Sequence, residues 1–443
     1  MIYDDLYLWY LGDPRQPRYV GELRLVALGK GVSLHYGKDW LETGFALSED
    51  LRLLDQLFPP PTRLEGYGGP RAVGAVDDAR PDRWGEKVIR HIDRPSRLSL
   101  MEYLYLAGDD RFGALGVSTS AESYEPKSRG PLPRLEAAQE LSDAASKISN
   151  AEKLTPAEET LIAGGGSPLG GAKPKALIKV QGREWVIKFF NGESVDAPLI
   201  EHATMTLAKE AKINVASTFP IRLNDCHALA IERFDRIGSM RIHSISAGTA
   251  LRAATPPGQE PDLGYPDLAL LLRRAGDTQD HLNKANAREL FRRMVFNILI
   301  DNTDDHEKNH ALLITDPFKH QRLVLAPAYD VLPCNSGQGQ QEFICGDNGT
   351  ESTLENAMSR CKDFGLSAPE AAQEVDTVIA VVNTWQDHFR QAQVSDRDIR
   401  ELSNQIDGAP LRSQRQNFKA SSFVARKKAS RKKNPFAPEQ SAS

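Results

Sequence analysis

The chain has 443 residues, of which 40% are hydrophobic and 26% are charged, and its formal net charge is −5. This composition is ordinary for a globular protein of two or three domains. No stretch approaches the roughly 20 apolar residues of a membrane helix, and the first residues lack the pattern of a signal peptide. The four cysteines show no C-x-x-C spacing, so neither a zinc knuckle nor a redox pair is indicated. We expect a protein that does not associate with membranes, in a reduced, cytoplasmic setting.

The first part of the chain has the composition of a β-rich domain. Three segments with many aromatic and β-branched residues are predicted to be strands: 5–12, 19–28 and 31–37. Apolar residues at helical spacing predict a helix over 77–92, and the apolar content continues through 98–107 to a glycine-containing loop at 108–116. The segment 123–133, rich in proline and charge, marks the first domain boundary.

A small sheet with one helix is predicted next. A helix over 135–147 precedes the glycine-rich stretch "AGGGSPLGGAK". A strand at Ala176–Val180, a tight turn and a second strand ending at Phe190 follow it. The remaining elements are one helix and two strands, predicted at 197–213, 216–223 and 227–235.

Helical patterns dominate from residue 263, and a basic run follows them. Between Arg412 and Lys433 there are nine Lys or Arg residues and no acid, with too few apolar residues to fold. We expect a solvated, disordered tail; the alternative is an electrostatic arm for nucleic acid or an acidic partner. The predicted domains are therefore an N-terminal subdomain, a sheet-containing lobe, a helical lobe and a tail, at 1–130, 131–262, 263–411 and 412–443.

The segment "NTDDHEKN", residues 302–309, is a dense group of polar residues that follows directly on an apolar helical segment. Solvent exposure is the simpler explanation. The sharper one is that Asp304 and Asn309, five positions apart, form the acid and the metal ligand of a phosphoryl-transfer loop. A second acidic ligand would come from Asp330, at the end of the apolar run in "RLVLAPAYD". Oxygen ligands of this kind suit Mg²⁺.

Lys188 lies in "EWVIKFF", between apolar strand residues. An edge strand that points Lys188 to water is the simpler explanation, because a buried lysine needs a partner. The functional interpretation is a strand lysine that holds nucleotide phosphates and pairs with a helix glutamate. Glu201 is the candidate partner, and Glu210, further along the same helix, is a weaker one.

Other motifs are weaker. The glycine-rich stretch matches neither the Walker A pattern nor G-x-G-x-x-G, so on its own it is typical of a linker. Asp301, Asp304, Asp305, His306 and His310 together suggest a metal hydrolase, and residues 306–310 have the H-E-x-x-H spacing, but this alternative is poorer than the ordered set of phosphoryl-transfer residues described above. Ser167 lies in no G-x-S-x-G elbow, which argues against a hydrolase nucleophile.

The order of the motifs, rather than any one of them, resembles the HipA family, the serine/threonine kinase toxins of bacterial type II toxin–antitoxin systems. The resemblance covers about residues 1–410. It includes "DDARPDRWGEKVI" and "DRFGALGV" in the N-terminal part, and "LGGAKPKALI", "VIKFF", "IERFDR", "NTDDHEKNHALL" and "LAPAYDVLP" further on. The fold it implies is α+β: an N-terminal α/β subdomain and a protein-kinase-like core with a mostly helical C-terminal lobe.

The resemblance also implies roles for individual residues. Asp304 would be the catalytic aspartate, Asn309 and Asp330 the Mg²⁺ ligands, and Lys188 a contact of the ATP phosphates. Further residues would lie against the nucleotide: the loop Gly170, Gly171, Ala172, Lys173, Pro174 and Lys175, the hinge Glu232 and Phe234, and His306, Glu307, Lys308 and Tyr329. The family often carries an autophosphorylated serine where this chain has Pro168, which has no hydroxyl; the neighbouring Ser167 is the candidate substitute.

The function implied is an ATP- and Mg²⁺-dependent serine/threonine protein kinase that inhibits growth as a toxin. Its implied partners are a small helix-turn-helix antitoxin (HipB-like), operator DNA through that antitoxin, and a protein substrate. The family's best-known substrates are aminoacyl-tRNA synthetases, but no residue of this chain identifies the target. Two alternatives stay open: a small-molecule kinase, against which Asn302 counts because such enzymes usually carry His there, and a catalytically silent kinase-fold partner of the antitoxin.

Overall fold

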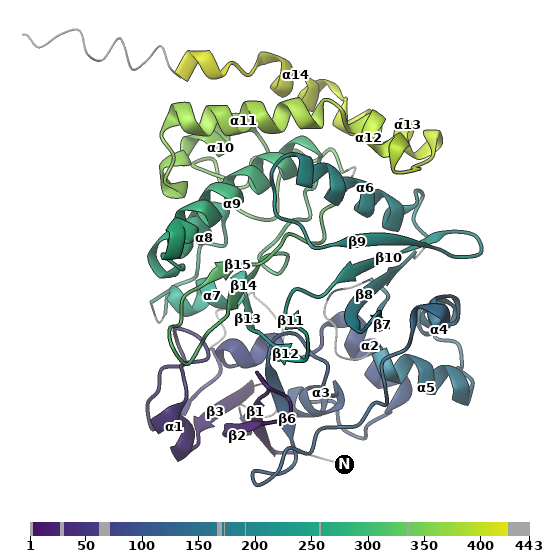
Figure 1. Cartoon of the computed structure of the whole chain (residues 1–443), viewed down its shortest axis with the longest axis vertical. Coiled ribbons are helices and arrows are strands. Elements are labelled where there is room, and N and C mark those ends of the chain that lie inside the picture. The colour runs from purple at the N-terminus through teal and green to yellow at the C-terminus, as the bar shows by residue number, and fades with distance from the viewer. Residues whose placement is uncertain are drawn as a thin grey trace, which may run out of the picture.

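The computed structural model describes residues 3–26, 31–61, 71–165, 171, 173–190, 192–256, 258–334 and 336–423. Figure 1 shows an N-terminal sheet, a second sheet with its own helices, and a helical lobe towards the C-terminus. This mixed architecture confirms the predicted α+β class. Within the described residues, no helix combines the length and the apolar character needed to cross a membrane.

The N-terminal sheet has six strands in the order β4-β3-β2-β1-β6, with β5 paired to β3. The strands are β1 Asp5–Tyr10, β2 Arg18–Val26, β3 Gly31–Tyr36, β4 Leu57–Phe58, β5 Arg71–Ala72 and β6 Leu115–Ser118. The first three confirm the predicted strands. Strand β6 was not predicted, because it begins inside the segment 108–116 that was interpreted as a loop. Its four residues are all buried beside β1, a long-range contact that local composition does not reveal.

Helices α1 Lys38–Thr43, α2 Arg83–Ile92 and α3 Leu100–Leu106 accompany this sheet. The helix predicted over 77–92 is two elements, a 3₁₀ helix at Gly74–Ala79 and α2. The break occurs because the Asp82 side chain caps α2 by accepting from the backbone N–H of Arg83. The first turn of α2 therefore starts at a defined point, beside Gly171.

The second sheet is antiparallel, in the order β7-β8-β10-β9. Its elements are β7 Lys175–Val180, β8 Arg183–Phe189, α6 Ala197–Glu210, β9 Thr218–Arg222 and β10 His227–Glu232, preceded by α4 Ala138–Ser149 and α5 Pro156–Gly165. Alternation along the strands buries both faces: Ala228 packs with α4 and α5, whereas Leu229 and Ile231 join the core that contains α6. Helix α5 was not predicted from the sequence.

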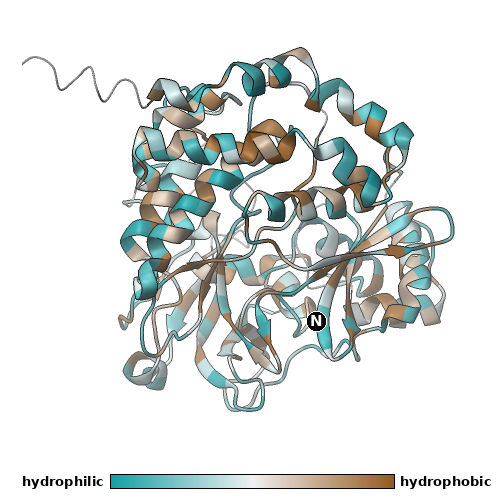
Figure 2. Ribbon diagram, turned by 45° about the horizontal axis from the view of Figure 1, so that its top comes forward, coloured by the Kyte–Doolittle hydropathy of each residue, from teal (hydrophilic) through white to brown (hydrophobic). Residues whose placement is uncertain are grey.

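The C-terminal lobe is mostly helical, and Figure 2 shows apolar and polar residues alternating along its helices. It contains α7 Ala247–Ala254, α8 Tyr265–Ala275, α9 Leu282–Leu299, α10 Leu354–Ser359, α11 Ala368–Val382, α12 Trp385–Gln391, α13 Asp396–Ile406 and α14 Ala409–Asn417. A three-stranded sheet (β13 His243–Ser246, β14 Ala311–Ile314 and β15 Val324–Leu325) lies beside them, with the small hairpin of β11 Arg236–Ile237 and β12 Met240–Arg241 before it. Strand β13, before the predicted boundary at 262/263, pairs with β14 after it.

Helix α14 runs across the predicted boundary at 411/412. Leu411 and Arg415 are buried on this helix, and Phe418 and Phe423 pack against the main core. Arg415 donates to the carbonyl of Ile406 at 2.6 Å and to Asp407 at 2.7 Å. Part of the segment expected to be disordered is therefore folded. The rest of the basic run, from residue 424, lies outside the described residues.

Candidate active site

Lys188, near the end of β8, is buried against two carboxylates. Its Nζ lies 2.7 Å from Oε1 of Glu201 on α6 and 2.7 Å from Oδ1 of Asp330. Lys188 is 8% exposed and Glu201 only 3%, so the lysine does not point to water. The structure thus brings together three residues that the sequence singled out separately, and no pairing of Lys188 with Glu210 is recorded.

Local backbone features explain why the two carboxylates converge. Asp196 caps α6 by accepting from the N–H of Leu199, and Pro198 occupies the first turn. This start places Glu201 on the buried side of α6, where it faces β8. Asp330 follows β15 and has φ of +57°, a left-handed conformation that few non-glycine residues adopt.

The charges in this group hold each other ionised. Burial lowers the pKa of Lys188, but Asp330 and Glu201 outweigh burial, so that the pKa lies above its usual value. Burial raises the pKa of Asp330, and Lys188 reverses this, leaving it well below the usual range. For Glu201 burial prevails, and its pKa is raised. Lys188 and Asp330 are therefore a cation and an anion at neutral pH.

A second lysine lies directly across the strands. Lys175 on β7 is the partner of Lys188 in the β7–β8 register and is also 8% exposed. Burial and the neighbouring Lys188 lower its pKa to about 8. Two buried ammonium groups on adjacent strands repel one another, and an anionic ligand relieves this repulsion.

The segment before Lys175 is held by the N-terminal domain. The backbone N–H of Trp84 on α2 donates to Gly171 O at 2.9 Å, and its indole N–H donates to Lys175 O at 2.7 Å. Gly171 has φ of +90°, and a Cβ there would lie 2.5 Å from the Lys175 ammonium, so only glycine fits. Four residues predicted in or before this loop lie outside the described residues: Ser167, Pro168, Gly170 and Ala172.

Asp304 and Asn309 occupy the turn between α9 and β14. The Asp304 side chain is exposed, whereas Asn309 is 8% exposed. Asn309 Nδ2 donates to the backbone carbonyl of Asp304 at 3.3 Å. This bond fixes the orientation of the amide and leaves Oδ1 as a free acceptor, for which no donor is recorded among the described residues. Next in the chain, Asp305 and His310 are buried and bonded to each other at 2.8 Å.

The residues predicted near the base of the nucleotide form an aromatic row. Phe234, just after β10, packs against Tyr329 with ring centroids 5.4 Å apart and planes tilted by 31°, and the ring of Phe112 in the N-terminal domain lies 6.4 Å from that of Phe234. The Tyr329 hydroxyl donates to Lys308 O at 2.6 Å. Glu232 is different: its side chain accepts from Arg183 at 2.7 Å at the outer part of the sheet, leaving only its backbone for a ligand.

The remaining predicted residues are engaged in ion pairs around the site. Lys173 lies 3.4 Å from Glu193, and Glu307 accepts from Arg252 at 3.0 Å. Lys308 donates to Asp82, the cap of α2, at 2.9 Å. His306 Nδ1 accepts from the backbone N–H of Lys308 at 3.2 Å. These contacts place the four residues around the loop without bringing their side chains to Lys188.

Sequence reasoning gave no role to several residues that build the site. Arg233 and Asp235, in "IERFDR", form a buried ion pair with Nη2 and Oδ2 2.8 Å apart, and Asp235 also accepts from the backbone N–H of Gly113 at 2.8 Å. Arg233 further donates to the carbonyl of Arg111. Both segments, "DRFGALGV" and "IERFDR", were already identified in the sequence as motifs of the family resemblance. Their mutual contact was not readable from either block alone.

The donor set fits a nucleotide with Mg²⁺. Asp330 offers a carboxylate and Asn309 a fixed amide oxygen, both of which Mg²⁺ prefers, and so few protein ligands leave positions for phosphate oxygens and water. Lys188 and Lys175 supply positive charge beside them. The exposed carboxylate of Asp304 is available to a substrate hydroxyl. The four-stranded sheet with its lysine–glutamate pair, set beside a helical lobe, defines a protein-kinase-like fold.

Comparisons with known proteins agree with this fold. Residues 167–385 match the model of the HipA-like C-terminal domain. The chain is 29% identical over 163 residues to the putative kinase Y4dM of Sinorhizobium fredii, covering 34% of this chain and 37% of that protein. It is 23% identical over 326 residues to the serine/threonine-protein kinase toxin HipA of Shewanella oneidensis, covering 67% and 69%. The chain thus spans little more than a third of Y4dM.

A solved structure extends the likeness over almost the whole chain. The HipA protein in a complex of Shewanella oneidensis HipA, HipB and operator DNA superposes with a TM-score of 0.63 at 18% identity, covering 95% of this chain and 98% of that one. At this identity the match shows the fold. Together with the domain match, it places the protein in the HipA family.

Proposed function

We propose that this protein is an ATP- and Mg²⁺-dependent protein kinase that phosphorylates serine or threonine, and that it acts as the growth-inhibiting toxin of a HipA-type toxin–antitoxin system. The observation that carries the proposal is the contact of the buried Lys188 with two carboxylates, the buried Glu201 and the partly exposed Asp330. A structural ion pair alone would not require a second buried lysine, Lys175, directly opposite the first.

Each residue has a distinct task in this proposal. Lys188, oriented by Glu201, and Lys175 would hold the phosphates. Asp330 and Asn309 would hold Mg²⁺, which when bound neutralises charge that develops on the transferred group. Asp304 would accept or orient the substrate hydroxyl proton, because its carboxylate is exposed at the turn. Phe234 and Tyr329 would flank the adenine ring.

The proposed partners follow from membership of the HipA family. They are a small helix-turn-helix antitoxin resembling HipB, operator DNA reached through it, and a protein substrate, for which aminoacyl-tRNA synthetases are the first to test. No residue of the described site selects among substrates. The site operates in the cytoplasm in this proposal, where ATP and such substrates are found.

The direct test is transfer of labelled phosphate. Purified protein is incubated with γ-labelled ATP, Mg²⁺ and a cell lysate, with the Asp304→Asn variant as the matched control. We expect labelled protein bands that the variant does not produce, with the label on serine or threonine after acid hydrolysis. Absence of protein labelling, together with labelling of a small molecule such as an aminoglycoside, would replace this proposal with a small-molecule kinase. No transfer at all would support a catalytically silent fold.

Self-modification is a separate part of the proposal. Because Pro168 cannot accept a phosphate, Ser167 is the proposed autophosphorylated residue. Mass spectrometry after incubation with ATP should find a phosphate on Ser167, and the Ser167→Ala variant should lack it while still labelling the lysate. A phosphate found at another residue, or none, would exclude Ser167 from this role.

A further inference from the structure

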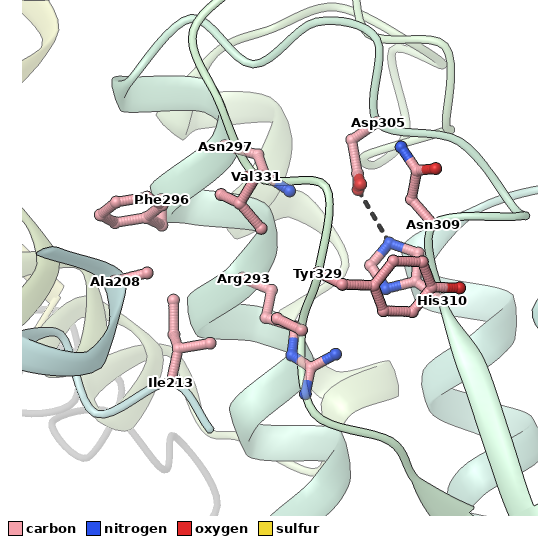
Figure 3. A pocket seen from close by; sticks show the side chains of 11 residues that line it. Ala208, Ile213, Arg293, Phe296, Asn297, Asp305, Asn309, His310, Tyr329 and Val331 are labelled. Carbon is pink, nitrogen blue, oxygen red and sulfur yellow. Dashed lines mark hydrogen bonds and ion pairs between the residues drawn. The ribbon is translucent and has the colours of Figure 1, made fainter. Parts of the chain in front are cut away.

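The segment from Asp304 to Asn309 is closed on itself by the two residues that follow those positions. Asp305 and His310 are 1% and 3% exposed. Asp305 Oδ2 accepts from Nε2 of His310 at 2.8 Å, and Figure 3 shows this contact as the dashed line beside Asn309 and Tyr329. The contact joins the two ends of the loop at a point directly behind the two residues that face the substrate and the metal.

This contact is anchored to the helical lobe rather than to the loop alone. The Tyr265 hydroxyl, from the first residue of α8, donates to the same Oδ2 of Asp305. Asn297 on α9 donates to the Tyr265 oxygen at 3.0 Å, and Asn302 donates to Asn297 at 3.1 Å. The Asp305 carboxylate therefore has fixed donors from two sides, and α8 and α9 share one hydrogen-bond network with the loop.

The imidazole of His310 is held in one orientation by aromatic packing. Its ring stacks on Phe343 with centroids 5.6 Å apart and planes 22° apart, and it meets Tyr265 edge-on at 5.4 Å. Tyr265 also contacts Phe343 at 4.9 Å. Because these three rings fix one another, Nε2 of His310 keeps its direction towards Asp305 without relying on the hydrogen bond alone.

We propose that Asp305 and His310 form a clamp, a pair of positioning residues that sets the separation of the Asp304 carboxylate from the Asn309 amide. The inference rests on the proposed kinase function, since it assigns a purpose to the spacing of those two groups. Neither clamp residue touches the substrate or the metal. A buried polar pair is seldom retained for stability, because an apolar pair of similar volume serves as well or better. What this pair supplies is a defined distance across the loop.

The same contacts argue against the metal-hydrolase alternative for these residues. A metal ligand needs a lone pair directed at the ion, but Oδ2 of Asp305 already accepts from both His310 and Tyr265. The Nε2 atom of His310 carries the proton of that bond, so it cannot coordinate a metal in this arrangement. Asp305 and His310 are thus explained by the loop they close.

The test compares two substitutions of one residue. His310→Phe keeps the aromatic packing and removes the hydrogen bond, whereas His310→Gln retains an amide N–H near the position of Nε2. His227→Phe is the matched control, because His227 forms a similar pair with Asp196, at 2.6 Å, outside the catalytic loop. Each variant of the full chain is measured for kcat and KM of phosphoryl transfer, for affinity towards a non-hydrolysable ATP analogue, and for melting temperature.

We expect His310→Phe to lower kcat about 10- to 100-fold, because a displacement of about 1 Å in a reacting group can cost that much. The KM for ATP should change less than about twofold, since the phosphate contacts lie elsewhere. His310→Gln should recover most of kcat, and His227→Phe should match the wild type. A wild-type kcat in His310→Phe would overturn the clamp. Parallel losses of kcat, nucleotide affinity and melting temperature in both His310 variants would overturn it too, by indicating a general structural role.

A second measurement does not depend on catalysis. Hydrogen exchange of the nucleotide-free protein should show faster exchange in 302–310 for His310→Phe than for His310→Gln or the wild type, with α11 unchanged. If the wild type transfers no phosphate, the proposed function fails while this comparison still decides whether the clamp exists. Equal exchange in all proteins would overturn it.

Discussion

The two chemical ends of the site are built in opposite ways. Lys188, Glu201 and Asp330 are bonded to one another and held by β8, α6 and the turn after β15. Asp304, in contrast, engages only its backbone within the part of the chain that the structure describes, and its carboxylate is exposed on a turn. In the proposed reaction, the Lys188 group binds ATP, which is the same in every reaction. Asp304 instead acts on a protein substrate, which must approach from solvent.

This contrast indicates which part of the site is held rigidly and which part stays accessible. Preorganised charges are most effective when they lie in a site shielded from water, because they need no rearrangement as the reaction proceeds. A group that receives a large substrate must instead remain accessible. Behind the exposed end, a buried hydrogen-bond network from Asp305 and His310 to Tyr265 and Asn297 holds the loop that carries Asp304. Substitutions at either end should therefore separate binding from chemistry.

The largest effect is expected at the exposed end. Asp304→Asn should lower kcat by about 10²- to 10⁴-fold, because an amide cannot accept the hydroxyl proton. Affinity for ATP should stay within about twofold, since Asp304 makes no contact with Lys188 or Asp330. Radiolabel transfer and calorimetry measure the two quantities. A variant that labels substrate at the wild-type rate would show that the exposed carboxylate is not catalytic. Overexpression of the variant should not arrest growth.

At the buried end, Lys188→Met should reduce kcat by about 10²- to 10³-fold through loss of a phosphate contact. It should also destabilise the fold by about 3 kcal/mol, because the buried Glu201 and the partly exposed Asp330 both lose their cation. Denaturant unfolding measures the second effect. The double variant Lys188→Met with Glu201→Gln is the control, and it should recover part of the stability but none of the activity. Full activity in either variant would contradict the assignment of Lys188.

The metal can be separated from the phosphate contacts at Asp330. Asp330→Ala should weaken ATP binding about tenfold or more in Mg²⁺ and much less in EDTA, because the carboxylate would act through the ion. Asp330→Asn, which keeps one oxygen donor, should fall between the wild type and the alanine variant. Calorimetry in the two buffers gives the comparison. Equal losses with and without Mg²⁺ would mean that Asp330 acts only through its contact with Lys188.

The pH dependence should sharpen the contrast between the two lysines. Burial and Lys188 bring the pKa of Lys175 down to about 8, whereas the pKa of Lys188 lies above its usual value. Lys175 is therefore mostly charged at pH 7 and about a tenth charged at pH 9, so nucleotide affinity should fall severalfold over this interval while Lys188 stays protonated. Lys175→Arg, which keeps its charge, should flatten the profile. An unchanged slope would show that Lys175 does not contact the phosphates.

Local pattern sufficed for much of the fold and for the separate parts of the site. The strands β1 to β3 followed from their many aromatic and β-branched residues, and the lysine in "VIKFF" suggested a buried charge that needs a partner. The five-residue spacing of Asp304 and Asn309 indicated their common loop. In each case the relevant residues lie close in sequence, so that composition and spacing carry the information.

Contacts between distant segments were not readable in this way. Trp84 donates to Lys175 O across 91 positions, and β13 pairs with β14 across more than 60. The carboxylate of Asp305 is bound by Tyr265, 40 positions earlier in the chain. Helix α5 was missed for another reason: its Pro156 start and Gly165 end look like loop residues, although proline suits the first turn of a helix.

The smallest effect is expected at the C-terminal boundary, which the sequence placed too early. The basic run obscured the few apolar positions of α14. Truncation after residue 411 would remove Arg415, whose guanidinium donates to Asn383 at 3.0 Å and to Asp407 at 2.7 Å. That truncation should lower the melting temperature by several degrees, at about 1–2 kcal/mol of lost hydrogen bonding.

Truncation after Phe423 should leave both melting temperature and kinase activity unchanged. Truncation after Phe423 removes the six basic residues of the run that lie between residue 424 and Lys433. Because these residues act through electrostatics, their loss should weaken association with DNA, direct or through the antitoxin, at low salt only. Gel shifts at low and high salt make the comparison, and identical shifts at low salt would mean that the basic run only aids solubility.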